Sequence, residues 1–102
     1  MGRRSRTDTN QKLIVEELRK LGASVEYLSN VGKGVPDLLV GVDGVNFLLE
    51  VKSLVTSYGR KGLNDMQQDW HAKWKGQKAV VSNLEEAIQV VFQSQSNKQI
   101  SN

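Results

Sequence analysis

The chain has 102 residues, which fits one small domain with a single hydrophobic core. Its composition, 38% hydrophobic and 25% charged, includes no apolar run near the roughly 18 residues of a membrane span, so we expect no membrane partner. The net charge is +3. The lack of cysteine excludes disulfides and thiolate metal sites, and it favours a cytoplasmic setting.

The N-terminal part is expected to form a basic arm, residues 1–8, followed by a helix. The arm favours a polyanionic partner, although a merely solubilising charge set explains it equally well. Apolar residues at helical spacing before Gly22 predict the helix: Leu13, Ile14, Leu18 and Leu21. A short strand over 23–29 and a turn-rich loop over 30–34 should follow.

Asp43-Gly44 lies between two apolar runs, residues 35–42 and 45–52, and this pattern predicts a two-residue β-hairpin. In that register Leu38 faces Leu49, and Asp37 falls opposite Glu50. Directly opposed Cβ atoms lie about 4.5–5.5 Å apart, so the two carboxylates should lie side by side. Lys52 points to the same face as Glu50.

Two acids so close together repel each other, and one lysine offsets only part of that repulsion. A divalent cation would offset the rest, and an all-oxygen site suits magnesium or manganese better than zinc. Taken singly, Asp37 is an ordinary turn residue after proline, and Glu50 and Lys52 are ordinary residues of a solvated strand edge. Their opposition within apolar surroundings favours a metal site.

The rest of the chain predicts a loop, a helix, a strand and a further helix. In the loop after Lys52 the candidate DNA contacts are Tyr58, Arg60 and Lys61, with Lys33 from the earlier loop, or these residues are simply solvated. The second helix is predicted by Leu63, Met66, Trp70 and Trp74, with both tryptophans in the core rather than in a base-stacking platform. A strand over 78–82 and a capping box of Ser82 and Glu85 lead into the third helix.

These elements define an α/β fold with one sheet flanked by helices, because both faces of the hairpin strands are apolar. We expect a single domain over residues 9–92. The polar tail, residues 93–102, is expected to be disordered.

The acids and lysine lie in a motif order that resembles the PD-(D/E)XK nuclease superfamily. Residues 34–41, 48–52 and 63–71 are similar to successive motifs of its virus-type replication-repair nuclease (VRR-NUC) group, which is Holliday-junction-resolvase-like. The resemblance implies a restriction-endonuclease-like core of order α-β-β-β-α-β plus a C-terminal helix, with a central mixed sheet.

The resemblance also implies roles for individual residues. Asp37, Glu50 and the backbone carbonyl of Val51 would hold the metal, Lys52 would position the attacking water or steady developing charge, and Gln67 would orient the lysine or a phosphate. Related nucleases often carry a first-helix glutamate. Here Asn10 lies at the inward position, and Glu17 is the nearest acid to the inward stripe.

The implied activity is that of a Mg²⁺- or Mn²⁺-dependent endodeoxyribonuclease that cuts branched or structured DNA, in a bacterial or phage-infected cell. A four-way junction needs two cuts, so we expect a homodimer, with its contact at Val90, Val91 and Phe92. Two alternatives remain open: a noncatalytic DNA-binding module on the same fold, and a nonspecific or restriction-type duplex nuclease.

Overall fold

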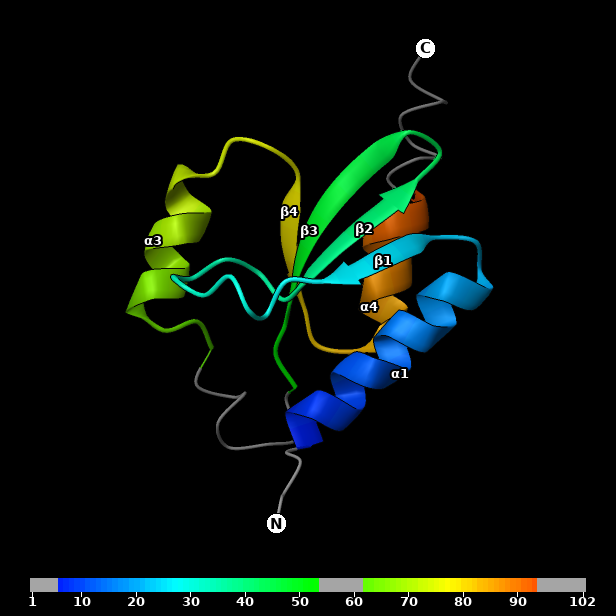
Figure 1. The fold of residues 1–102 in the computed structure, drawn as a ribbon, viewed down its shortest axis with the longest axis horizontal. Helices are drawn as coiled ribbons and strands as arrows, with labels where there is room; N and C mark the ends of the chain where they lie inside the picture. Colours follow the sequence, from blue (N-terminus) through cyan, green and yellow to red (C-terminus); the bar gives the residue numbers. More distant parts are fainter. Residues whose placement is uncertain (1–5, 54–61, 94–102) are drawn as a thin grey trace.

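The computed structural model describes residues 6–53 and 62–93. Figure 1 shows the elements in chain order, which are α1 (Arg6–Lys20), β1 (Ser24–Tyr27), β2 (Leu38–Val42), β3 (Val45–Val51), α3 (Asp65–Lys73), β4 (Lys78–Val81), α4 (Leu84–Ile88) and a π-helical turn η1 (Gln89–Gln93). The predicted α/β order is confirmed. Because α1 begins at Arg6, the last three residues of the expected arm are helical.

The strands form one mixed sheet in the order β1-β2-β3-β4. The β1–β2 and β2–β3 pairs are antiparallel, whereas β3 and β4 run parallel. Asp43 and Gly44 have φ angles of 51° and 81°, as a type I′ turn requires. The predicted register is confirmed, since Leu38 pairs with Leu49.

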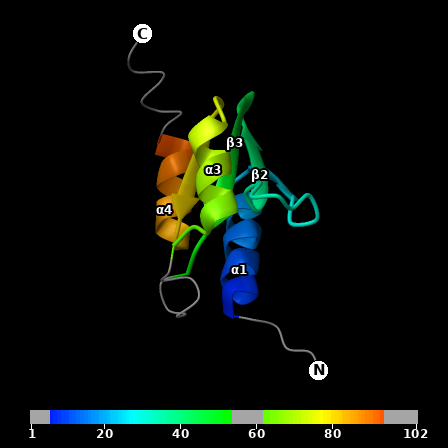
Figure 2. The same cartoon turned by 90° about the vertical axis from the view of Figure 1, so that its left-hand side faces the viewer.

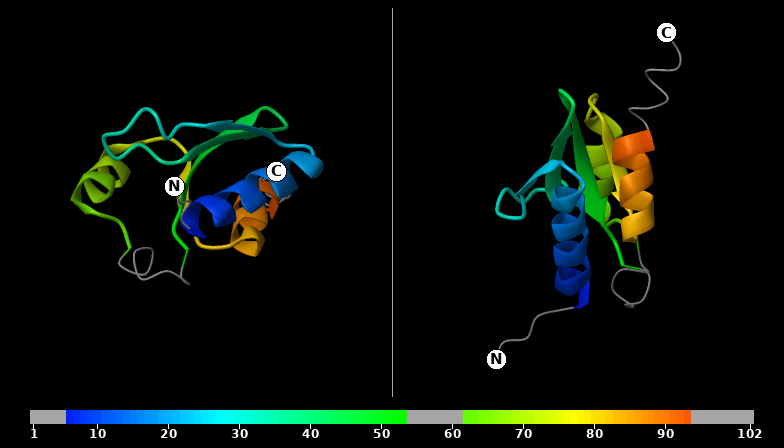
Figure 3. Two further views of the ribbon diagram at one scale, coloured as in Figure 1. Left: turned by 60° about the horizontal axis from the view of Figure 1, so that its bottom comes forward. Right: turned by 90° about the vertical axis from the view of Figure 1, so that its right-hand side faces the viewer.

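One face of the sheet carries the core, and Figure 3 shows α1 and α4 together on that side. The largest fully buried side chains include Ile14, Val15, Leu18, Leu38, Leu49 and Val91. Leu13 and Leu21, which were expected in the helix stripe, are instead 47% and 52% exposed, because α1 turns Val15 toward the sheet in their place.

The apolar end of the third helix was expected to form a dimer contact, and the structure uses it differently. Val91 is fully buried, and Val90 and Phe92 are partly buried against the same core. The π-helical turn brings these residues onto the sheet. Their apolar character is therefore explained within one chain and gives no reason to place a dimer contact there.

Helix α3 lies apart from α1 and α4, next to the loop between β1 and β2 (Figures 1 and 2). None of its side chains is fully buried, and Trp74 is 44% exposed. The expectation that both tryptophans belong to the core is therefore wrong. No second layer covers this helix within the described residues, so its apolar side chains line a pocket instead.

Smaller differences concern the element ends. The cap of α4 is Asn83, whose side chain accepts a hydrogen bond from the Glu86 backbone at 2.8 Å, one residue later than the predicted capping box. Ser82 instead donates from both its backbone N–H and its hydroxyl to the Glu86 carboxylate. Among the described residues, no helix is long and apolar enough to cross a membrane.

Candidate active site and metal centre

Asp37 lies immediately before β2, where the backbone fixes it from both sides. Its carbonyl oxygen accepts a hydrogen bond from Leu28 N–H at 2.7 Å, and its side-chain Oδ2 accepts one from Val51 N–H at 2.8 Å. The preceding Pro36 is buried. The half-buried carboxyl group of Asp37 is thus held against the end of β3.

Glu50 lies opposite Asp37, as the register predicted, and is only 2% exposed. Its Oε2 accepts a hydrogen bond from Gln67 Nε2 at 3.1 Å and lies 3.9 Å from Lys52 Nζ. Its Oε1 is buried and finds no hydrogen-bond donor anywhere in residues 6–53 and 62–93. A buried carboxylate oxygen without a partner is costly, which marks this position as one that awaits a ligand or a proton.

The two acids change each other's protonation. Burial, reinforced by the negative charge of Asp37, raises the pKa of Glu50 from 4.5 to about 8 against the opposing effect of Lys52. Burial also raises the pKa of Asp37, although the Val51 N–H opposes this. Near neutral pH Glu50 therefore holds a proton, and through it Glu50 can hydrogen-bond to Asp37. A cation bound between the two carboxylates would take the place of that proton.

Lys52 completes the charged cluster from the end of β3. The residue is only 7% exposed, and its backbone N–H donates to the Val81 carbonyl at 2.9 Å, which ties it to β4. An ammonium group so deeply placed is a fixed positive charge rather than a mobile surface one.

Gln67 comes from the first turn of α3 and reaches two partners at once. Its Nε2 donates to Glu50, while its Oε1 accepts from the Asn64 backbone N–H at 3.0 Å. The Asn64 side chain in turn accepts from Gln67 N–H at 2.9 Å, which makes a capping box. The helix start and the buried acid therefore share one amide.

The first helix approaches the acids through Gln11, a residue that sequence reasoning missed. Burial raises the pKa of Asp37, and the Gln11 side chain is the smallest of the influences that lower it. Asn10 instead donates to the Ser82 carbonyl at 3.3 Å, and Glu17 forms an exposed ion pair with Lys20 at 3.2 Å. Gln11 lies one turn before Val15, whose burial in the structure shows that this face of α1 turns inward.

Of the candidate DNA contacts, only Lys33 lies in the described residues. It has a φ of 57° in the loop between β1 and β2, and it lines a pocket with residues of α3. Tyr58, Arg60 and Lys61 lie outside the described residues.

The donor set at this site fits magnesium or manganese. Asp37 and Glu50 offer carboxylate oxygens, and the Val51 carbonyl is the further candidate. Glu50 Oε1 has no hydrogen-bond partner among residues 6–53 and 62–93, so it could serve as a metal ligand. The part of the chain that the structure describes contains no group of three or more His, Cys, Asp or Glu residues that could hold a metal. A magnesium ion held by two carboxylates and one carbonyl would keep several of its waters.

A four-stranded mixed sheet flanked by helices, with an acid pair where β2 begins and β3 ends, is consistent with the restriction-endonuclease-like class of fold. Among solved structures, this chain is similar to one described as a VRR_NUC domain, with a TM-score of 0.66 and 27% sequence identity. The match covers 85% of this chain and 95% of that one, and it supports a VRR-NUC domain assignment. In the comparisons by sequence, no family model and no curated protein matches.

This similarity to a VRR_NUC domain supports a nuclease-domain family for the chain. The predicted restriction-endonuclease-like fold is thereby confirmed.

Proposed function

We propose that this protein is a metal-dependent, structure-selective DNA endonuclease that hydrolyses phosphodiester bonds in branched DNA. The observation that carries the proposal is the Asp37–Glu50 pair, in which a buried carboxylate oxygen lacks a partner within the described residues. Burying two adjacent acids lowers stability, so a functional reason is needed for keeping them.

In this proposal Asp37 and Glu50 hold the metal, with the Val51 carbonyl as a further ligand. When bound, Mg²⁺ supplies Lewis-acid polarisation of the phosphate and acidifies a water. Lys52 contributes a preorganised positive charge beside Glu50, where negative charge develops on the phosphoryl oxygens. Gln67 fixes the orientation of the Glu50 carboxylate, and Gln11 influences Asp37 from the first helix.

Selectivity for structure rather than sequence follows from the kind of surface available. The described residues hold no recognition helix or zinc finger that would read base edges in the major groove. Recognition through phosphates and shape is the remaining mode, and four-way junctions are the substrate that the resemblance suggests. Paired cuts across a junction would need two copies of this one-site chain.

The test is a cleavage panel with one DNA sequence arranged as a four-way junction, a flap and a linear duplex, each with Mg²⁺, Mn²⁺ or EDTA. We expect metal-dependent cutting of the branched substrates at rates at least about tenfold above those of the duplex. Equal cutting of all three would favour a nonspecific nuclease. Binding without cutting under either metal would favour a noncatalytic module.

A further inference from the structure

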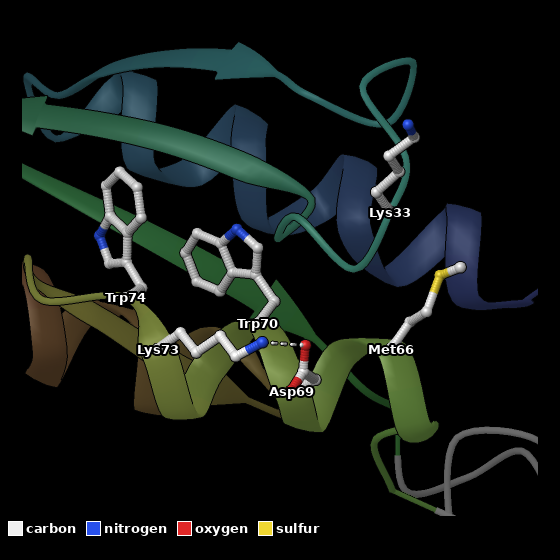
Figure 4. A pocket seen from close by; sticks show the side chains of 6 residues that line it. All are labelled: Lys33, Met66, Asp69, Trp70, Lys73 and Trp74. Atoms are coloured by element: carbon white, nitrogen blue, oxygen red, sulfur yellow. Dashed lines mark hydrogen bonds and ion pairs between the residues drawn. The ribbon is translucent and has the colours of Figure 1, made fainter.

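Beside the acids lies a second feature, a pocket of about 380 Å³ between α3 and the loop that joins β1 to β2. Figure 4 shows its lining, with Lys33 on the loop across from the side chains of α3. The other lining residues are Met66, Asp69, Trp70 and Lys73 of α3 and Trp74, which caps the C-terminal end of that helix.

The walls of this pocket are mainly aromatic. Trp70 and Trp74 stack with ring centroids 5.0 Å apart and an interplanar angle of 15°. Met66 is 58% exposed and Trp74 is 44% exposed, so this apolar surface is open rather than buried. An open aromatic surface of this kind usually marks a binding site.

The charges around the pocket select among possible occupants. Lys33 and Lys73 stand at its rim, while Asp69, the one acid in the lining, lies 3.1 Å from Lys73 in an ion pair. One lysine of the lining thus has its charge offset by Asp69. An indole wall with a net positive rim complements a nucleotide, whose base stacks on aromatic rings and whose phosphate pairs with lysine.

The pocket is joined directly to the acids. Gly34 packs on the Met66 carbonyl so closely that a Cβ there would clash with it, and the same Cβ would lie 3.2 Å from Gln67 N. Gln67 in turn donates to Glu50. One end of α3 therefore serves both the acid pair and the pocket.

We propose that this pocket, named here the tryptophan pocket, binds an unpaired base of the DNA substrate next to the phosphate that is cut. The base stacks on the indole wall, and Lys33 contacts the adjoining phosphate. This inference rests on the proposed function only in taking DNA as the ligand. It adds a source of structure selectivity, because a base held in a regular duplex is not free to enter.

The chain provides its own reporter, since its only two tryptophans line the pocket. Tryptophan emission is followed while a short oligo-dT is added in EDTA, where no cleavage occurs. An abasic oligonucleotide of equal length and a blunt duplex serve as comparison ligands. We expect strong quenching by oligo-dT and little by the abasic strand, because the abasic strand has the phosphates without the bases.

Variants separate stacking from charge. Trp70→Leu keeps an apolar side chain and leaves Trp74 as reporter, and it should weaken oligo-dT binding roughly 5- to 100-fold while leaving abasic binding unchanged. Lys33→Ala should weaken both ligands and reduce the salt slope by about one. Lys20→Ala removes an exposed lysine of α1, outside the tryptophan pocket, and should change neither.

Equal quenching by oligo-dT and the abasic strand would overturn the proposal. So would emission that shifts with protein concentration before DNA is added, with no response to oligo-dT, because a second copy would then occupy the pocket. If Trp70→Leu does not fold, the comparison of ligands on the unaltered protein still decides. Cutting with Mg²⁺ but no base-dependent quenching would contradict base binding in the pocket and leave the nuclease proposal intact. Base-dependent quenching without cutting would support base binding and contradict the nuclease proposal.

Discussion

Gln67 Nε2 lies 3.1 Å from Glu50 Oε2, and the same amide closes the capping box of α3 through its Oε1. The helix therefore cannot shift at its start without disturbing the buried acid. Conversely, the acid receives a hydrogen bond from a neutral amide. This shared amide is one contact that couples α3 to the sheet.

Gln67→Ala should reduce Mg²⁺-dependent cutting about 10- to 100-fold, as losses of residues that orient metal ligands do. The matched control is Asn64→Ala, which removes the cap side chain but keeps the backbone N–H that Gln67 binds. Asn64→Ala should lower stability by about 1 kcal/mol with cutting within a few fold. Equal losses of activity in both variants would show that Gln67 acts only through the helix.

The raised pKa of Glu50 predicts how the stability of the metal-free protein depends on pH. The unfolded value is 4.5 and the folded value about 8, so the folded state holds the extra proton between them. The stability that this proton contributes is therefore fully present below pH 4.5 and is lost as the pH rises through about 8. The raised pKa of Asp37 also makes the protein less stable as pH rises. The lowered pKa of His71 has the opposite effect on stability, in the range just below pH 6.5.

Thermal melts in EDTA should accordingly show a Tm that falls from pH 5 to pH 9. In Glu50→Gln, which is neutral at every pH, that slope should flatten. Added Mg²⁺ should raise the Tm of the unaltered protein most at high pH, where the metal no longer competes with a proton. A Tm that rises steadily from pH 5 to pH 9 without metal would contradict the protonated pair.

Gly34 and Gly32 allow the contact between the loop and α3 to be tested with a built-in control. Both have positive φ, 85° and 73°, but only a Cβ at Gly34 would meet the Met66 backbone. Gly32→Ala should cost about 1–2 kcal/mol from backbone strain alone. Gly34→Ala should cost more in urea unfolding and should also impair cutting. Equal costs would show that the loop moves freely away from α3.

The first helix offers a direct test of which residue serves the site. Because Gln11 is the first-helix side chain that influences Asp37, Gln11→Ala should weaken Mn²⁺ binding, measured by calorimetry, by several fold. Glu17→Gln changes an exposed ion pair and should leave Mn²⁺ binding within twofold. A larger loss of Mn²⁺ affinity in Glu17→Gln than in Gln11→Ala would instead indicate that Glu17 serves the metal site.

The sequence predicted the hairpin and its acid pair because local chemistry determines both. Asp43-Gly44 selects the turn, the turn sets the register, and the register opposes Asp37 to Glu50. The positions of Gln11 and the tryptophans depend instead on how far each helix rotates and on what covers it. Helical spacing identifies an apolar face of α3 but does not reveal that no layer covers it, so Trp74 was placed in the core.

The end of the chain illustrates the same limit. Val90, Val91 and Phe92 exceed what a one-sided helix needs, and that excess was read as a contact between copies. A π-helical turn changes the spacing so that these residues reach the core of their own chain. Such a change of helical period leaves no clear mark in the sequence.

The central claim, that the Asp37–Glu50 pair holds a metal for DNA cleavage, is tested most directly by single-turnover cutting of a four-way junction with Glu50→Gln. We expect a loss of at least about a hundredfold in Mg²⁺. We also expect a Tm equal to or above that of the unaltered protein at pH 8 in EDTA, since the buried charge is gone. Cutting at the unaltered rate by a folded Glu50→Gln variant would contradict it.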